Sequence, residues 1–143
     1  MSFEITRRTK RSAADAWARL TDWERHTGLI PFTTVSPTSG PTEGVGSRFN
    51  ARTAVGPIRF DDEMEVTHWT PPTNTEPGVC RIVKRGRTVV GWAVLTVTPE
   101  TSGSVVTWHE EANFRLAGPF LNWPNALAGK AVFAKLVDGL LED

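Results

Sequence analysis

Three side chains have the type and position for acid–base chemistry: Asp62, His68 and Glu110. Asp62 and His68 share one face of an alternating stretch with Phe60 and Met64, so both are expected to point into the interior. An inward carboxylate that is partly desolvated suits a general acid or base, and a neutral imidazole could accept a proton or hydrogen-bond a ligand. Two structural alternatives stay open: a β-bulge that turns Asp62 outward, and a rim position for His68.

Glu110 lies between Trp108 and Ala112 on the apolar parity of the last expected strand. A buried carboxylate there needs a cationic partner, because an unpaired buried charge costs several kcal/mol. Arg81 is the expected cation, although its own alternation with valines places it inside only weakly. The Arg81–Glu110 pair could be structural or could orient a ligand.

Large aromatic side chains could form the wall of a ligand cavity. Trp92 and Trp108 come from strands expected to be adjacent, where they could face a flat ring or simply fill the core. Phe120 and Trp123 precede the last helix, near the expected mouth, whereas Trp69 falls on the polar parity and is expected at the rim or surface. The expected ligand-binding residues are Phe49, Phe60, Met64, Arg81, Trp92, Trp108, Phe120, Trp123, Phe133 and Leu136.

Metal and nucleotide chemistry is not indicated. The three histidines lack metal-ligand spacing, and the single cysteine, Cys80, has no CxxC partner and no sequence-adjacent base. The chain contains neither GxGxxG nor a P-loop. We therefore expect no metal and no cofactor.

The composition is that of an ordinary globular chain, with 39% hydrophobic and 22% charged residues among 143. A net charge of zero argues against a nucleic-acid partner, which requires a basic surface. No apolar run approaches the ~20 residues of a membrane span, and the first residues do not resemble a signal peptide. A cytoplasmic protein is the default expectation.

The C-terminal segment predicts the element that covers these residues. Phe133, Leu136, Val137, Leu140 and Leu141 follow the i, i+3, i+4, i+7, i+8 spacing of one helix face. Such an amphipathic helix must bury its apolar face against another element. The sheet-forming chain before it is the expected partner.

The remaining chain predicts two short early helices and about seven strands. Ser12 is expected to cap the first helix, with Asp15 in the capping box, and Trp23–His26 forms the second. The fold expected for a single domain, residues 1–143, is α+β: a curved antiparallel sheet with the long C-terminal helix over its concave face. Phe3–Thr9 is expected as an exposed edge strand, through which a homodimer could pair. The other expected strands are Thr33–Ser36, Ser47–Thr53, Ile58–Trp69, Val79–Arg85, Thr88–Thr98 and Ser104–Asn113.

This order of elements carries a family resemblance. With SAADAWARLTDWERHTGLIP, VGPIRFDDEMEVTHWTPP, GWAVLTVTPETSGSVVTWHEE and the final helix, the chain resembles the START/Bet v 1-like (SRPBCC) superfamily. It is most similar to the polyketide cyclase/dehydrase-type members common in bacteria. The resemblance implies a helix-grip fold whose cavity, between sheet and long helix, holds lipids, sterols, polyketides or other apolar molecules.

Three functions follow as hypotheses. The first is a protein that binds an apolar small molecule of lipid, polyketide or aromatic type. The second is a cyclase or dehydratase in which Asp62, His68 or Glu110 moves protons. The third is a protein-interaction domain with a filled core, which a cavity smaller than the ~300 Å³ of a small-ligand site would favour.

Overall fold

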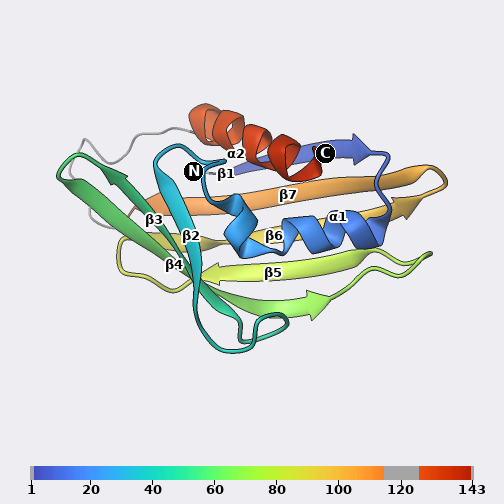
Figure 1. Cartoon of the computed structure of the whole chain (residues 1–143), viewed down its shortest axis with the longest axis horizontal. Helices are drawn as coiled ribbons and strands as arrows, with labels where there is room; N and C mark the ends of the chain where they lie inside the picture. The colour runs from blue at the N-terminus through green and yellow to red at the C-terminus, as the bar shows by residue number, and fades with distance from the viewer. Residues whose placement is uncertain (1, 115–125, 143) are drawn as a thin grey trace.

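The computed structural model describes residues 2–114 and 126–142, and its central element is an antiparallel sheet (Figure 1). Within these ranges seven strands lie in the order β1-β7-β6-β5-β4-β3-β2, so the sheet is open and β1 and β2 form its edges. The predicted edge position of the first strand is confirmed, while a homodimer through it stays a prediction. The strands are β1 (Ser2–Thr9), β2 (Thr33–Ser39), β3 (Arg48–Val55), β4 (Ile58–Thr70), β5 (Gly78–Lys84), β6 (Val89–Glu100) and β7 (Gly103–Phe114).

The helices cover one face of this sheet (Figure 1). They are α1 (Ala13–Leu20), the 3₁₀ helix η1 (Trp23–His26) and α2 (Ala126–Leu141). The predicted start of α1 is confirmed, since the Ser12 hydroxyl accepts a hydrogen bond from the Asp15 backbone N–H at 3.1 Å. No helix in the described ranges is both long and apolar enough to cross a membrane.

The predicted apolar face of α2 is confirmed. Leu136, Val137 and Leu140 are at most 2% exposed, and Phe133 packs with its ring centroid 5.1 Å from that of Phe3 on β1. Phe133 and Leu141 are half-buried, while Leu136, Val137 and Leu140 between them are fully buried. The C-terminal half of α2 is therefore its main anchor to the rest of the fold.

Two arginines, Arg11 just before α1 and Arg19 within it, bind the C-terminal end of α2. Arg11 Nε donates to the Leu141 carbonyl at 2.8 Å and Arg11 Nη2 donates to the Glu142 carbonyl at 2.9 Å. Arg19 Nη1 on α1 donates to the Glu142 carbonyl at 2.8 Å. The last carbonyls of a helix have no partner within the helix and carry partial negative charge, so guanidinium groups stabilise this end.

A register shift in β4 changes which side chains face inward. One extra residue, Thr67, lies between the pairings of Val66 and His68 with β5. Beyond this bulge the alternation is reversed: Trp69 packs inward, with its ring centroid 5.1 Å from that of Trp17, and His68 is exposed. Of the two positions left open for His68, the inward one is therefore wrong and the exposed one holds. The prediction that Trp69 lies at the rim or surface is wrong.

The anchor role of α2 predicts a large effect of one truncation. Leu136→Ala should lower the free energy of unfolding by about 2–5 kcal/mol, because it leaves a cavity where the side chain is fully buried. Lys135→Ala, on the exposed side of the same turn, is the control and should change it by less than about 0.5 kcal/mol. Urea unfolding measures both, and equal stabilities would show that α2 does not depend on this face.

Candidate functional site

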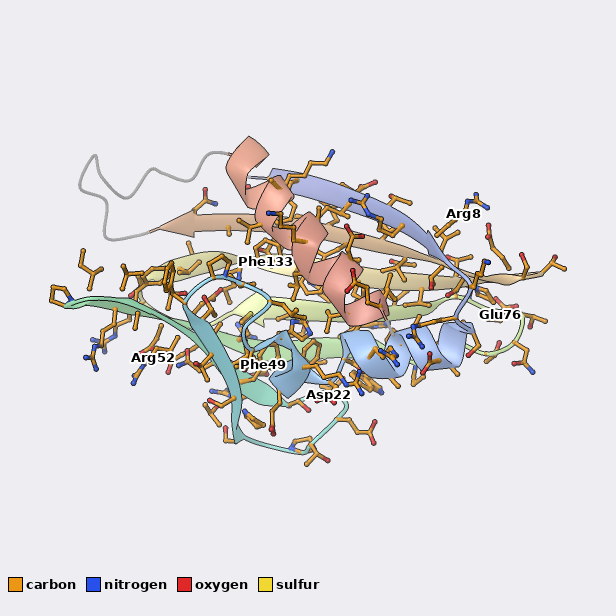
Figure 2. The ribbon with its side chains drawn as sticks, turned by 45° about the horizontal axis from the view of Figure 1, so that its top comes forward. Arg8, Asp22, Phe49, Arg52, Glu76 and Phe133 are labelled. Carbon is orange, nitrogen blue, oxygen red and sulfur yellow. The ribbon has the colours of Figure 1, made fainter. Side chains whose placement is uncertain are left out.

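A small cavity lies between the helices and the sheet. Its volume is about 50 Å³, and its wall is mostly apolar, with side chains from η1, several strands and α2. Phe49 on β3 and Phe133 on α2 both border it and lie on the helix-covered side, whereas Arg52 points away from the interior (Figure 2). Polar side chains also border the cavity, and those among the described residues are His26, Asp62, Lys84 and Glu110.

Lys84 is the centre of this polar group. Its side chain is 2% exposed, and its Nζ lies 2.6 Å from Asp62 Oδ2 and 3.9 Å from Glu110 Oε2. Glu110 in turn accepts a hydrogen bond at Oε1 from Trp108 Nε1 at 3.2 Å. The cluster thus holds an ammonium and two carboxyl groups inside an apolar wall, and it joins β4, β5 and β7.

Burial separates the protonation behaviour of these groups. It raises the pKa of Glu110, and the opposing effect of the Lys84 ammonium is smaller. Burial lowers the pKa of Lys84, but the Glu110 and Asp62 carboxyl groups outweigh it and the net direction is upward, so the ammonium stays charged. Glu110 therefore takes up a proton more readily than an ordinary glutamate does. Two carboxyl groups in different environments are the arrangement that acid–base chemistry uses.

His26 is a buried member of the wall that the sequence prediction missed. Its Nε2 lies 2.9 Å from the Leu20 carbonyl, which assigns the proton to Nε2 and leaves Nδ1 as an acceptor. Burial lowers its pKa to about 4, so the ring is neutral at pH 7. Trp23 and Trp108 lie beside it, with ring centroids at 5.6 and 6.0 Å. The i, i+3 spacing of Trp23 and His26 in a short helix was the available signal.

Trp23 supplies the aromatic part of the wall next to β3. Its ring is stacked on Phe49, with centroids 4.4 Å apart and planes at 10°. The side chain is buried, yet its Nε1 has no hydrogen-bond partner among the described residues, and the same holds for Asp62 Oδ1. Buried polar atoms are normally paired, so both atoms are candidates for contact with a ligand or water.

The whole chain, residues 1–143, matches the family described as polyketide cyclase / dehydrase and lipid transport. The protein belongs to this family. No curated protein matches the chain in sequence at a significant level.

Several solved structures have a fold similar to that of this chain. The protein TTHA0849 from Thermus thermophilus superposes with a TM-score of 0.72 at 14% identity, over 98% of this chain and 94% of that one. The STAR-related lipid transfer protein (fragment 25–204) from Xanthomonas axonopodis gives 0.68 at 15%, over 98% and 83%. Norcoclaurine synthase from Thalictrum flavum, in complex with dopamine and hydroxybenzaldehyde, gives 0.58 at 14%, over 98% and 85%. These similarities confirm the predicted helix-grip fold.

The cation predicted to face Glu110 was the wrong one. Arg81 is exposed on the opposite face of the sheet, where its guanidinium carbon lies 5.5 Å from the centroid of Trp92. Trp92 also meets His109 edge-on there, with ring centroids 4.8 Å apart. The expected places of Arg81 and Trp92 in the cavity wall are therefore wrong, and Lys84 takes the position expected of Arg81.

The other predicted site residues divide by position. The structure brings Asp62 and Glu110 together, whereas His68 lies outside and contacts the Thr70 hydroxyl at 3.0 Å. Two further predicted residues, the fully buried Leu136 and the half-buried Phe60, are not among the described residues that border the cavity. Phe120 and Trp123 lie outside the described residues. The predicted residues that do border the cavity are Phe49, Asp62, Met64, Trp108, Glu110 and Phe133.

Removal of the central ammonium should destabilise the fold strongly. Lys84→Met leaves the buried Glu110 and the partly buried Asp62 without their cation, and we expect a loss of about 3–5 kcal/mol in the free energy of unfolding. The triple variant with Asp62→Asn and Glu110→Gln should recover part of that loss. Arg81→Met, on the opposite face of the same strand, is the control. Urea unfolding measures all of these variants. Equal free energies of unfolding for Lys84→Met and Arg81→Met would contradict the central role of Lys84.

The buried His26 should make stability depend on pH. Between pH 6.5 and about 4 the unfolded histidine is protonated and the folded one is not, so stability falls as pH falls through this window. The slope from this group reaches at most about 1.4 kcal/mol per pH unit. His26→Gln should reduce the slope and His68→Gln should not. Thermal or urea unfolding from pH 7 to pH 4 measures it, and identical slopes in both variants would disprove the assignment.

Proposed function

We propose that the protein binds an apolar small molecule, of lipid, polyketide or aromatic type, in the cavity beside Lys84. The observation that carries this proposal is a charged cluster buried within an apolar wall. Such a cluster adds little stability over a fully apolar interior, because a complete buried ion pair is often no better than apolar residues of the same volume. A few polar groups in an apolar pocket are instead typical of a ligand site, where they orient the bound molecule.

The family and its structural relatives support the same function. The family description includes lipid transport, and one relative is a lipid transfer protein. Another relative is in complex with two small aromatic molecules, dopamine and hydroxybenzaldehyde. Shared fold alone does not fix a ligand, so the class of molecule rests on the wall of the cavity.

The volume of the cavity sets a condition on this proposal. About 50 Å³ holds water rather than a ligand, since small-molecule sites start at ~300 Å³. Binding therefore requires a side chain of the wall to move. Phe133 is the side chain we assign, because it is half-buried and belongs to the less buried half of α2. The same volume favours the filled-core interaction domain as the second candidate function.

A cavity-enlarging variant separates the two functions. Phe133→Ala should bind naphthalene roughly tenfold more tightly than the wild type, because it removes the side chain that must otherwise move. A tenfold gain in affinity corresponds to ~1.4 kcal/mol, which is less than burial of an aromatic ring contributes. Phe32→Ala is the control, because Phe32 is 70% exposed and its removal should not alter affinity. Titration calorimetry measures all three proteins. If neither the wild type nor Phe133→Ala binds naphthalene, the filled-core function replaces the proposal.

A further inference from the structure

Two polar atoms at the cavity have opposite and unmet hydrogen-bonding needs. Trp23 Nε1 is a donor and Asp62 Oδ1 is an acceptor; both are buried, and neither has a partner within the part of the chain that the structure describes. Trp23 as a residue is 5% exposed and the Asp62 side chain is 17% exposed, so bulk water is largely kept from them. Both residues border the same cavity.

Neighbouring contacts restrain both side chains. The Trp23 ring is stacked on Phe49, which holds the indole plane, and Asp62 Oδ2 is bound to the Lys84 ammonium at 2.6 Å. Asp62 Oδ1 is therefore held in place by the hydrogen bond that the other oxygen of its carboxyl group makes. A ligand that meets both atoms gains from groups already positioned before it binds.

We infer that the apolar ligand carries a hydroxyl group, as a phenol or an alcohol, which accepts a hydrogen bond from Trp23 Nε1 and donates one to Asp62 Oδ1. This inference rests on the proposed function. A hydroxyl is a small neutral group that both accepts and donates through one atom. A ketone oxygen only accepts, so it would leave Asp62 Oδ1 unpaired.

Charge excludes a carboxylate ligand from the same position. Among the described residues, the cluster holds two acidic groups, Asp62 and Glu110, against one cation, Lys84. An ionised carboxylate would lack a proton for Asp62 and would add a further negative charge to a desolvated site. A hydroxylated apolar molecule should therefore bind more tightly than the corresponding acid.

Three probes of matched ring shape test this inference: naphthalene, 2-naphthol and 2-naphthoate. With ¹⁵N-labelled wild-type protein, 2-naphthol should bind roughly tenfold more tightly than naphthalene, as expected for one hydrogen bond to a charged group, and 2-naphthoate should bind most weakly. The Trp23 indole N–H resonance should move downfield with 2-naphthol and not with naphthalene. The Trp92 indole N–H, on the opposite face, is the internal control and should not move.

Two variants test whether Trp23 Nε1 and Asp62 Oδ1 cause the preference for 2-naphthol over naphthalene. Trp23→Phe keeps an aromatic ring against Phe49 but removes the N–H, and Asp62→Asn removes the charge. Each should reduce the preference for 2-naphthol over naphthalene from roughly tenfold to about threefold or less. Because Asp62→Asn also disturbs Lys84, Trp23→Phe provides the independent test.

The outcomes distinguish this inference from the proposed function. If naphthalene and 2-naphthol bind equally to the wild type, Trp23 Nε1 and Asp62 Oδ1 are hydrogen-bonded to water. The hydroxyl inference is then overturned, while the proposed binding of an apolar molecule stands. Tighter binding of 2-naphthoate would also overturn it. If none of the three probes binds, both the inference and the proposed function fail.

Discussion

The ion pair between Lys84 and Asp62 is the interaction on which the interior depends. It places an ammonium group within the sheet, where burial of a lone cation would be prohibitive, and Glu110 supplies the second carboxyl group from β7. The cluster thereby links strands β4, β5 and β7 through side chains as well as through the backbone ladder. It also gives an otherwise apolar cavity a polar end with a defined direction.

The packing of the helices determines how much space remains in the cavity beside Lys84. The C-terminal half of α2 is held by fully buried leucines and by Arg11 and Arg19, which bind its last carbonyls. Phe133, nearer the start of the helix, is only half-buried and contacts both Phe3 and Trp108. Regions with less buried surface open at lower free-energy cost, so the cavity is expected to widen at Phe133 rather than near Leu136.

Alternation along strands predicted most of the fold and the inward carboxyl groups of Asp62 and Glu110, because a strand with one buried face has a period of two. Alternation gave the wrong inward residues where a bulge broke the period of two or where both faces of a strand were apolar. The extra residue at Thr67 reverses the faces of β4 and leaves no mark in composition. On β5, apolar residues occupy both parities, so alternation could not decide between Arg81 and Lys84 as the buried cation. Only the pairing with neighbouring strands settles that choice.

Intermolecular NOEs between naphthalene and the protein test the central claim most directly, because they locate the bound molecule. The account predicts NOEs from the ring protons to the methyl groups of Met64, Ile82 and Ala93, all of which border the cavity. NOEs confined to the exposed Val55 and Ile58 would place the molecule on the surface and contradict an interior site.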